Sequence, residues 1–375
     1  MLNSRFRASI AGLAFVTAGI APESYSQTED TLTIYGLINK ELRYVAQSED
    51  AGKESSVAVT DVDGFESRIG VKGSQDGDFK ISYVAEVGVN SGRDASSDYR
   101  IRPRIFKVDL DTKGYGVITI GQDWMPSALF YIKMDGLAAT VAQNYNLDTS
   151  YVVGGLGYGS LQGLGYNFRA FRDQIRYASP TWNGLTYKLS YDTNGPHDYD
   201  GVQRNVEHFL QYTRDTLNVG LLYADCESCD ADMKLPSIGL AANIKTAGGL
   251  AAGFNYGLQT IGHGTDENGD MEEIIVTRIF ASFSYQKDEN TYSLTYGNAT
   301  LGDQDYIVAL DETISANYKE ASQQQIGLGY KNMITAKTAL KLTIAQMSIS
   351  ADEPIVSDKK ENVAQVVALG VQTGF

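Results

Sequence analysis

From Thr31 onward, apolar and polar residues alternate with a period of two. The segments LTYKLSY (185–191), TYSLTYG (291–297) and QQIGLGY (324–330) each place Tyr, Leu or Ile on one face and smaller or polar residues on the other. Successive side chains of a β-strand point to opposite faces, so this pattern predicts half-buried strands. No stretch after the N-terminal segment has a helical period of comparable clarity. The chain is therefore predicted to be all-β.

The connections between these strands alternate in length. Seven short polar turns alternate with eight longer connections, which gives fifteen connections and sixteen strands. An even number of antiparallel strands with short turns at one end and long loops at the other is typical of an outer-membrane β-barrel. The short turns are expected at 73–78, 111–115, 179–184, 214–216, 245–249, 286–290 and 331–337, and the longer connections at 47–63, 91–99, 124–172, 193–203, 226–233, 261–271, 300–320 and 350–361.

Two other β architectures compete with the barrel. A secreted β-sandwich also alternates, but its connections need not segregate by length. A β-helix or adhesin stalk would have a short fixed repeat, and none is seen. Tyrosines near strand ends favour the aromatic girdles of a barrel, although they could also be core residues of a soluble β protein. These tyrosines are Tyr44, Tyr83, Tyr187, Tyr191, Tyr212, Tyr223, Tyr285, Tyr292 and Tyr330.

The first 26 residues have the pattern of a secretory signal peptide. Arg5 and Arg7 precede the apolar run IAGLAFVTAGIA, which is too short to span a bilayer as a helix. We expect cleavage after Ser26, with Ala21 as the alternative, and a single barrel domain over 27–375. A buried N-terminal helix is the competing interpretation. No later segment approaches 18 uninterrupted apolar residues, so the exported protein is either soluble or a β-barrel.

The charge balance excludes one class of partner. The chain has 31 Lys and Arg against 46 Asp and Glu, a formal net charge of −15. A protein that binds nucleic acid would show a basic excess, so no nucleic-acid partner is expected.

Several segments resemble the general Gram-negative porins in order and spacing. LTIYGLINKELRYV (32–45) is similar to their first strand, and ESRIGVKGSQDGDFKISYVAEV (66–87) is similar to their second hairpin. GYGVITIGQDW (114–124) resembles the strand before their constriction loop, and QIRYASPTWNGLTYKLSY (174–191) resembles the hairpin after it. The terminal Phe375, with apolar residues at alternate positions behind it, resembles the signal by which such barrels are recognised for assembly.

The resemblance implies a sixteen-stranded, water-filled diffusion channel that is usually trimeric, with its long third loop folded into the lumen. That loop corresponds to 124–172, the longest connection in the chain; irregular strands outside the barrel are the alternative. The acidic PEFGG-like tip of the enteric porins is missing. Asp135 and Asp148 are the candidate acidic residues within the loop, with Asp123 and Asp173 at its ends.

Three arginines occupy alternate positions in YRIRPRIF (99–106). An arginine on the lipid face near the midplane costs about 2–4 kcal/mol, so three would cost roughly 6–12 kcal/mol. We therefore expect Arg100, Arg102 and Arg104 to face the lumen, unless Arg100 and Arg102 belong to the second long loop and contact lipopolysaccharide. Alternation along the neighbouring strands predicts that further residues also face the lumen. With the three arginines, Arg43 and Arg68 resemble the basic wall that faces an acidic third loop in the porin family, and Glu41 and Glu66 are predicted to face the pore beside it.

The remaining motifs predict no catalytic or metal chemistry. Cys226 and Cys229 form a CxxC in a predicted external loop, where a small disulfide or two free thiols are favoured over a metal site. TDENGDMEE (265–273) lacks the full EF-hand pattern and is expected to be a solvated loop. No GxSxG motif or Ser–His arrangement suggests an enzyme. We expect no cofactor, no metal and no enzymatic activity.

The favoured function is a general diffusion porin of the Gram-negative outer membrane for ions and small hydrophilic solutes. The alternatives are a barrel that serves mainly as an adhesin or receptor through its external loops, and a soluble exported β-binding protein. Expected partners are two further copies of the chain in a homotrimer, outer-membrane lipid and lipopolysaccharide, and the barrel-assembly machinery through Phe375. The sequence leaves the sign of ion selectivity open, because a negative exterior opposes a basic wall.

Overall fold

The computed structural model describes the strands and the short connections of the chain. The described residues are 31–47, 55–61, 67–89, 101–128, 130, 171–193, 206–225, 236–265, 271–301, 306–311, 314–318, 322–350 and 361–375. The part of the chain that the structure describes contains no helix long and apolar enough to cross a membrane.

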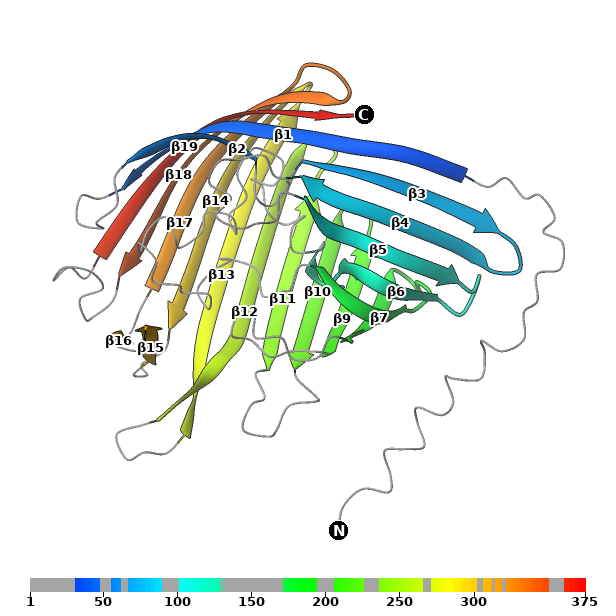
Figure 1. Ribbon diagram of the computed structural model, residues 1–375, viewed down its shortest axis with the longest axis horizontal. Coiled ribbons are helices and arrows are strands. Elements are labelled where there is room, and N and C mark those ends of the chain that lie inside the picture. The colour runs from blue at the N-terminus through cyan, green and yellow to red at the C-terminus, as the bar shows by residue number, and fades with distance from the viewer. Residues whose placement is uncertain are drawn as a thin grey trace, which may run out of the picture.

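Almost all described residues lie in antiparallel β-strands (Figure 1). The strands before the longest connection are β1 (Thr31–Gln47), β2 (Ser56–Asp61), β3 (Arg68–Asp76), β4 (Lys80–Val89), β5 (Ile101–Asp111) and β6 (Val117–Trp124). The strands after it are β7 (Phe171–Ala178), β8 (Leu185–Asp192), β9 (Val206–Arg214), β10 (Leu217–Asp225), β11 (Ser237–Lys245), β12 (Leu250–Thr265), β13 (Met271–Lys287), β14 (Asn290–Leu301), β15 (Tyr306–Asp311), β16 (Ile314–Tyr318), β17 (Ser322–Met333), β18 (Thr338–Ser350) and β19 (Glu361–Gly374).

The strands close into one barrel. Most strands pair with the next strand along the chain, β14 pairs with β17, and β19 returns to pair with β1 from Leu37↔Gly374 to Gln47↔Ala364. The opposite edge of β1 pairs with β3 over Thr31–Leu37 and with β2 over Lys40–Val45. β2 and β3 together therefore occupy the second strand position of the barrel. With β15 and β16 set apart as a separate hairpin, the barrel has sixteen strands, as the sequence predicts.

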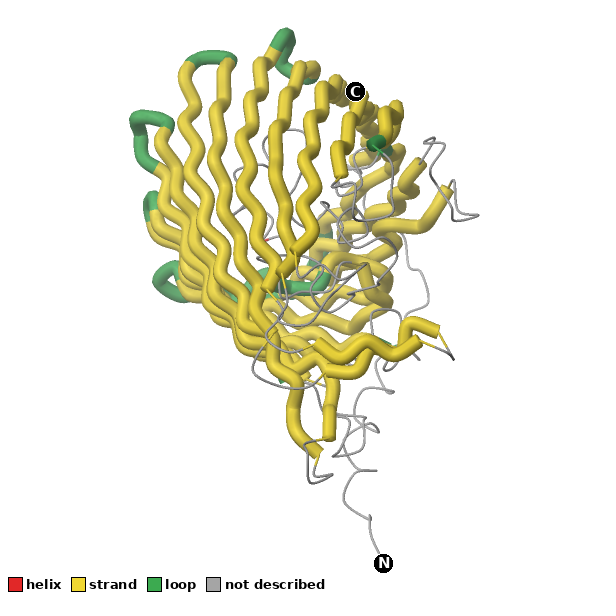
Figure 2. The backbone as a smooth tube through the Cα atoms, turned by 90° about the vertical axis from the view of Figure 1, so that its left-hand side faces the viewer, coloured by secondary structure: helices red, strands yellow, loops and turns green. Residues whose placement is uncertain are grey.

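Short and long connections lie at opposite ends of the barrel, and the short turns gather at one end in Figure 2. All seven predicted short turns are confirmed. Several carry a residue in the left-handed region, such as Asn183 (φ 47°) followed by Gly184 (φ 87°) in the β7–β8 turn. Asn and Gly adopt positive φ more readily than other residues, which suits two-residue hairpins.

Two predicted long connections contain strands. The connection expected at 47–63 includes β2, and the one expected at 300–320 includes the β15–β16 hairpin. β2 has only six residues, too few for its alternation to stand out in the sequence, and it is held as a strand by its pairing with β1. Whether such a short segment forms a strand thus depends on its partner strand rather than on its own sequence pattern.

The two faces of the barrel wall differ in polarity as the alternation predicts. On β17 and β18, Ile326, Leu328 and Ile344 are 51%, 54% and 49% exposed on the outer face, whereas the adjacent Gln325 and Thr343 are buried on the inner face. A soluble protein would hide such large side chains, but in a membrane they contact lipid. The outer face is therefore an apolar belt around a polar interior.

A β-bulge reverses the alternation in β5. Glu86 of β4 pairs with Ile105 and Val87 pairs with Pro103, so Arg104 is an extra residue without a partner of its own. Arg104 and Ile105 both turn toward Glu86, and every later residue changes face relative to simple alternation. Without the bulge, the face that carries Arg102 and Arg104 would also carry Phe106, and Lys107 would point at lipid. The bulge places all of these basic residues on the inner face.

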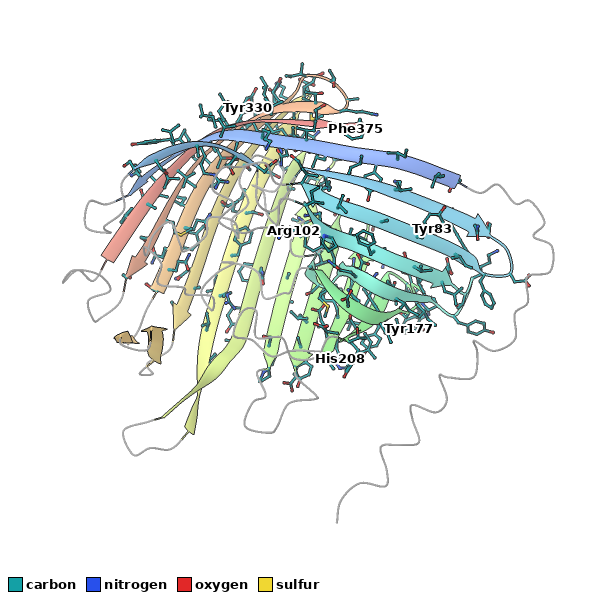
Figure 3. The ribbon with its side chains drawn as sticks, in the orientation of Figure 1. Tyr83, Arg102, Tyr177, His208, Tyr330 and Phe375 are labelled. Atoms are coloured by element: carbon teal, nitrogen blue, oxygen red, sulfur yellow. The ribbon has the colours of Figure 1, made fainter. Side chains whose placement is uncertain are left out.

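The C-terminal residue completes the closure. The backbone of Phe375 pairs with Gly36: the Phe375 N–H donates to the Gly36 carbonyl at 3.2 Å, and the Gly36 N–H donates back at 3.4 Å. A Cβ added to Gly36 would lie 2.0 Å from the Phe375 ring, so only glycine leaves room for the ring at this position. Phe375 is labelled at the short-turn end in Figure 3, as is Tyr330 at the end of β17.

Candidate permeation pathway in the barrel lumen

Glu86 of β4 is the centre of a charge cluster on the inner wall. Its carboxylate accepts a hydrogen bond from Arg104 Nε at 2.8 Å and lies 3.4 Å from Arg68 Nε. The phenol of Tyr35 donates to the second carboxylate oxygen at 2.9 Å. Glu86 and Arg104 are both buried, and the Arg104 guanidinium also lies 5.9 Å from the centre of the Trp124 ring. One carboxylate thus holds two of the five predicted basic residues.

Two further predicted basic residues lie on the same wall. Arg43 of β1 forms an ion pair with Glu41, two residues before it on the same face, and both side chains are buried. Arg102 pairs across the sheet with Gly88, two residues beyond the inward-facing Glu86, so it belongs to the inner face, and it is exposed (labelled in Figure 3). Arg43, Arg68, Arg102 and Arg104 therefore come together on one side of the lumen.

A second network lies nearer the short-turn end. Lys107 Nζ is 2.9 Å from Asp123 and 3.1 Å from Asp109, and Arg176 of β7 reaches Asp123 at 2.7 Å. Asp123 sits at the end of β6, just after Gly121, whose φ of 118° would strain any other residue. A Cβ on Gly121 would also lie 2.2 Å from the Phe106 carbonyl oxygen. Glycine therefore allows the close approach of β5 and β6 that brings Lys107 and Asp123 together.

This second network borders a cavity of about 820 Å³ inside the barrel. Cations outnumber carboxylates in its wall, because Lys72 and Lys188 join Lys107 and Arg176 against Asp109 and Asp123. Lys72 lies over the Tyr35 ring at 5.5 Å, and Lys188 donates to Gln211 at 3.1 Å. The remaining wall residues are Tyr35, Val84, Ile105, Val117, Thr119, Trp124, Met125, Pro126, Phe130, Ala178, Gln211, Asn218 and Asn243.

The first residues after β6 turn into the barrel. Phe130 is buried against Phe209 of β9, edge to face with ring centres 5.2 Å apart, in a cluster with Leu222 of β10. The backbone N–H of Ser127 donates to Glu207 Oε1 at 2.6 Å. These contacts anchor the described start of the third connection to the inner wall on the far side from β1. The rest of that connection, 131–170, lies outside the described residues.

The wall from β10 to β19 is built differently. Its inward-facing positions are mostly small or uncharged, and among the described residues of these strands the buried or half-buried charged groups of the inner face are all cations. The uncharged positions include Asn255, Ser282, Ser293, Thr295, Gln323, Gln325, Thr343 and Ala345, and the cations are Arg278, Lys331 and Lys341.

Several predicted residues lie outside the described part of the chain: Arg100, Glu66, Asp135, Asp148, Cys226 and Cys229. Their predicted roles remain predictions. The sequence reasoning also missed Lys107, Asp109, Arg176 and Lys188. A signal for the first two was available, because the adjacent apolar pair Ile105 and Phe106 breaks the alternation and indicates a bulge.

The charged and polar lining suits the lumen to charged and polar solutes. No three His, Cys, Asp or Glu of the described segments form a group that could hold a metal ion. His208 contacts Tyr187 at 2.7 Å on the outer face, away from the lumen. Fixed charges of both signs along a wet passage can orient dipolar solutes and favour hydrophilic ones.

Comparisons with known proteins agree with this geometry. A family profile described as Gram-negative porin matches residues 8–352. The fold resembles the anion-selective porin of Comamonas acidovorans, with 18% identity, a TM-score of 0.66 and coverage of 92% of this chain and 100% of that chain. It also resembles the outer membrane channel DcaP of Acinetobacter baumannii, with 11% identity, a TM-score of 0.65 and coverage of 92% and 97%.

A trimeric neighbour is the OmpT outer membrane protein of Vibrio cholerae, with 14% identity, a TM-score of 0.58 and coverage of 92% of this chain and 99% of that chain. No curated protein sequence matches the chain. The family profile covers most of the chain, including the strands that carry Arg43, Glu86 and Asp123. The chain therefore belongs to the Gram-negative porin family, whose members are channels of the outer membrane.

Proposed function

We propose that this porin, a general diffusion channel for ions and small hydrophilic solutes, favours anions over cations. The observation that carries the proposal is the excess of cations in the wall of the luminal cavity, where Lys72, Lys107, Arg176 and Lys188 oppose Asp109 and Asp123. Although the whole chain has a net charge of −15, a field is focused where a channel is narrow and its walls have a low dielectric constant. Luminal charges therefore weigh more than charges on the loops.

Selectivity can be measured directly. Purified protein in a planar lipid bilayer should give conductance steps, and a KCl gradient across the membrane should give a reversal potential of the sign produced by excess chloride flow. A reversal potential of the opposite sign would overturn the anion preference while leaving the channel intact. The Comamonas acidovorans neighbour is described as an anion-selective porin, which agrees with this direction. The adhesin alternative is not favoured, because the family consists of channels.

The third connection, in this proposal, narrows the lumen. Support comes from its described start, where Ser127 and Phe130 are buried against Glu207 and Phe209 inside the barrel. Arg102 and Arg104 would then face the remainder of the loop across a narrow gap, as would Arg43 and Arg68. Asp135 and Asp148 would supply part of the opposing charge.

A homotrimer is the proposed assembly, and an ion pair on the outer face supports it. Lys40 lies between the exposed Ile38 and Leu42 and pairs with Asp61, which is fully buried and also accepts from Ser67. Lys40 is level with Val371, four residues above Phe375, which places it about 10 Å into the apolar belt. A lone lysine facing lipid at such a depth costs about 2–4 kcal/mol.

The ladder on this edge of β1 stops between Leu37 and Lys40, where the Asn39 N–H donates to the Ser67 hydroxyl instead of to a backbone carbonyl. Irregular backbone at membrane depth is tolerated where protein covers it. We infer that neighbouring subunits cover this face. Asp61→Asn should lower the temperature at which trimers dissociate on unheated gels, and an unchanged temperature would count against this interface.

The proposal for export and assembly is that residues 1–26 direct secretion and that Phe375 is recognised by the barrel-assembly machinery. The closing contact between Phe375 and Gly36 supports the second part. Deletion of Phe375 should reduce the amount of protein in the outer membrane, whereas normal yield would contradict the role. Lipid and lipopolysaccharide are the proposed partners of the outer belt.

A further inference from the structure

Two lysines lie side by side on the inner face of β17 and β18. Lys331 and Lys341 are direct partners in the antiparallel register, so their Cβ atoms are about 4.5–5.5 Å apart and both point the same way. On β18, buried Ala339, Lys341 and Thr343 alternate with exposed Leu340 and Leu342. This alternation fixes the shared direction of the two lysines as inward.

Neither lysine of the pair has an ion-pair partner in the described structure. Lys341 is 3% exposed, and neither lysine has a hydrogen bond or an ion pair with any residue that the structure describes. The charged groups around Lys341 are Lys331, Arg68 and Glu41. Arg68 is already held by Glu86, and Glu41 is already paired with Arg43. The surroundings of Lys341 are therefore predominantly positive.

Such an arrangement is unfavourable by itself. Like charges directly opposite each other destabilise a sheet, and a buried ammonium group without a partner loses its hydration. The neighbours in the same row are small: Lys331 pairs on its other side with Thr291, and Lys341 pairs with Gly370, which has no side chain. With such small side chains on either side, the two ammonium groups are the largest groups of the row, and an anion bound between them would remove both penalties.

We propose that Lys331 and Lys341 form a binding site for a small oxyanion, such as inorganic phosphate, on the lumen wall near the short-turn end. Two ammonium groups on adjacent strands can donate to different oxygens of one anion, and charge-assisted hydrogen bonds are the strong ones. Both side chains face the lumen, so the ligand is a solute in the channel and not a lipid head group. The site rests on the proposed channel function, because the channel gives the anion access.

Binding can be tested apart from conduction. In a non-ionic detergent without phospholipid, inorganic phosphate should raise the unfolding temperature of the wild-type protein relative to KCl of equal ionic strength. Lys341→Met keeps the length of the side chain and removes its charge, so it should weaken the phosphate dependence at least about tenfold. Lys341→Arg should retain it. Lys287→Met, in the exposed β13–β14 turn, is the matched control and should behave as wild type.

The same variants sharpen the bilayer experiment. Phosphate should reduce the KCl current of the wild-type channel, and Lys331→Met should relieve the reduction. Because Lys331 is only half-buried, Lys331→Met also serves in the thermal experiment if the Lys341→Met protein does not assemble. A wild-type protein with equal unfolding temperatures in phosphate and chloride would overturn the site, as would a Lys341→Met protein that keeps the full shift. Absence of any conductance steps would contradict the channel function instead, since the thermal readout does not depend on conduction.

Discussion

The inner face of the barrel carries its polar residues in two different ways, one on the wall from β1 to β9 and the other on the wall from β10 to β19. The first is crowded with charges of both signs that hold one another, as in the Arg68–Glu86–Arg104 cluster and the Lys107–Asp123–Arg176 network. The second is lined by amides, hydroxyls and small residues, with Lys331 and Lys341 among them.

The difference teaches how a barrel keeps charges on an inner wall. A buried charge is stable only when it is paired and hydrogen-bonded, so the charged wall needs interlocking partners from several strands. The wall from β10 to β19 carries few charges, and we propose that its two adjacent lysines bind a solute anion. The start of the third connection is anchored where the two walls meet, since Phe130 contacts Phe209 of β9 and clusters with Leu222 of β10.

The largest expected effect comes from the centre of the charged wall. Glu86→Gln keeps the size of the side chain but leaves Arg68 and Arg104 without their carboxylate, which should cost about 3–5 kcal/mol of unfolding free energy. Urea unfolding of the protein folded in lipid vesicles measures this cost.

The matched change on the wall from β10 to β19 is Ser293→Ala. The Ser293 hydroxyl is buried with no hydrogen-bond partner among the described residues, so its removal should change stability little. Equal losses from the two substitutions would mean that the walls do not differ as described.

The junction of the two walls is tested by Phe130→Ala. Truncating this buried ring should remove about 3–5 kcal/mol of local anchoring, release the start of the third connection and admit larger sugars in a liposome-swelling assay. Ion selectivity should change little, because no charge is removed. Phe254→Ala, on the lipid-facing side of β12, is the control; a sugar cutoff that Phe130→Ala leaves unaltered would place the constriction elsewhere.

Arg104→Ala tests the ion selectivity of the channel rather than the size of the solutes that it admits. A unit charge about 8 Å from a permeating ion changes its energy in water by about 0.5 kcal/mol, which is about twofold in local ion concentration. The reversal potential in a KCl gradient should therefore shift toward cations, and Arg68→Ala should act in the same direction. Lys287→Ala, in a short turn outside the lumen, should do little; shifts of equal size from all three would show that these arginines do not line the passage.

Tyr35→Phe should reduce stability less than Glu86→Gln does. It removes one part-buried hydrogen bond to the Glu86 carboxylate and should cost about 1.5–3 kcal/mol at most, since the acceptor keeps both arginines. Tyr330→Phe removes a hydrogen bond to Asn290 beside the β13–β14 turn, where water can replace the lost partner. A larger loss from Tyr330→Phe than from Tyr35→Phe in urea unfolding would reverse the expected order of the walls.

Much of the fold follows from local features of the chain. The strands containing 185–191 and 324–330 were predictable because alternation is visible within a few residues. The turn at Asn183 and Gly184 was predictable because these two residue types readily adopt the positive φ of a two-residue turn. The inward direction of Arg104 followed from the cost of charge in lipid, and that of Arg43 followed from strand alternation. The partners of these arginines could not be predicted in this way, because Glu86 meets Arg104 only through the register of β4 and β5.

The sequence by itself determined the sixteen-stranded barrel and which face of most strands is polar, because both depend on period-two patterning and on the lengths of connections. Only the tertiary structure decided that a bulge at Arg104 brings Lys107 to the lumen, that Phe130 rests on Phe209, and that Lys331 lies directly beside Lys341. The reason is physical. Alternation is a property of one strand, whereas register is set by pairing between segments that are distant in the chain, and one extra residue changes the face of every residue after it.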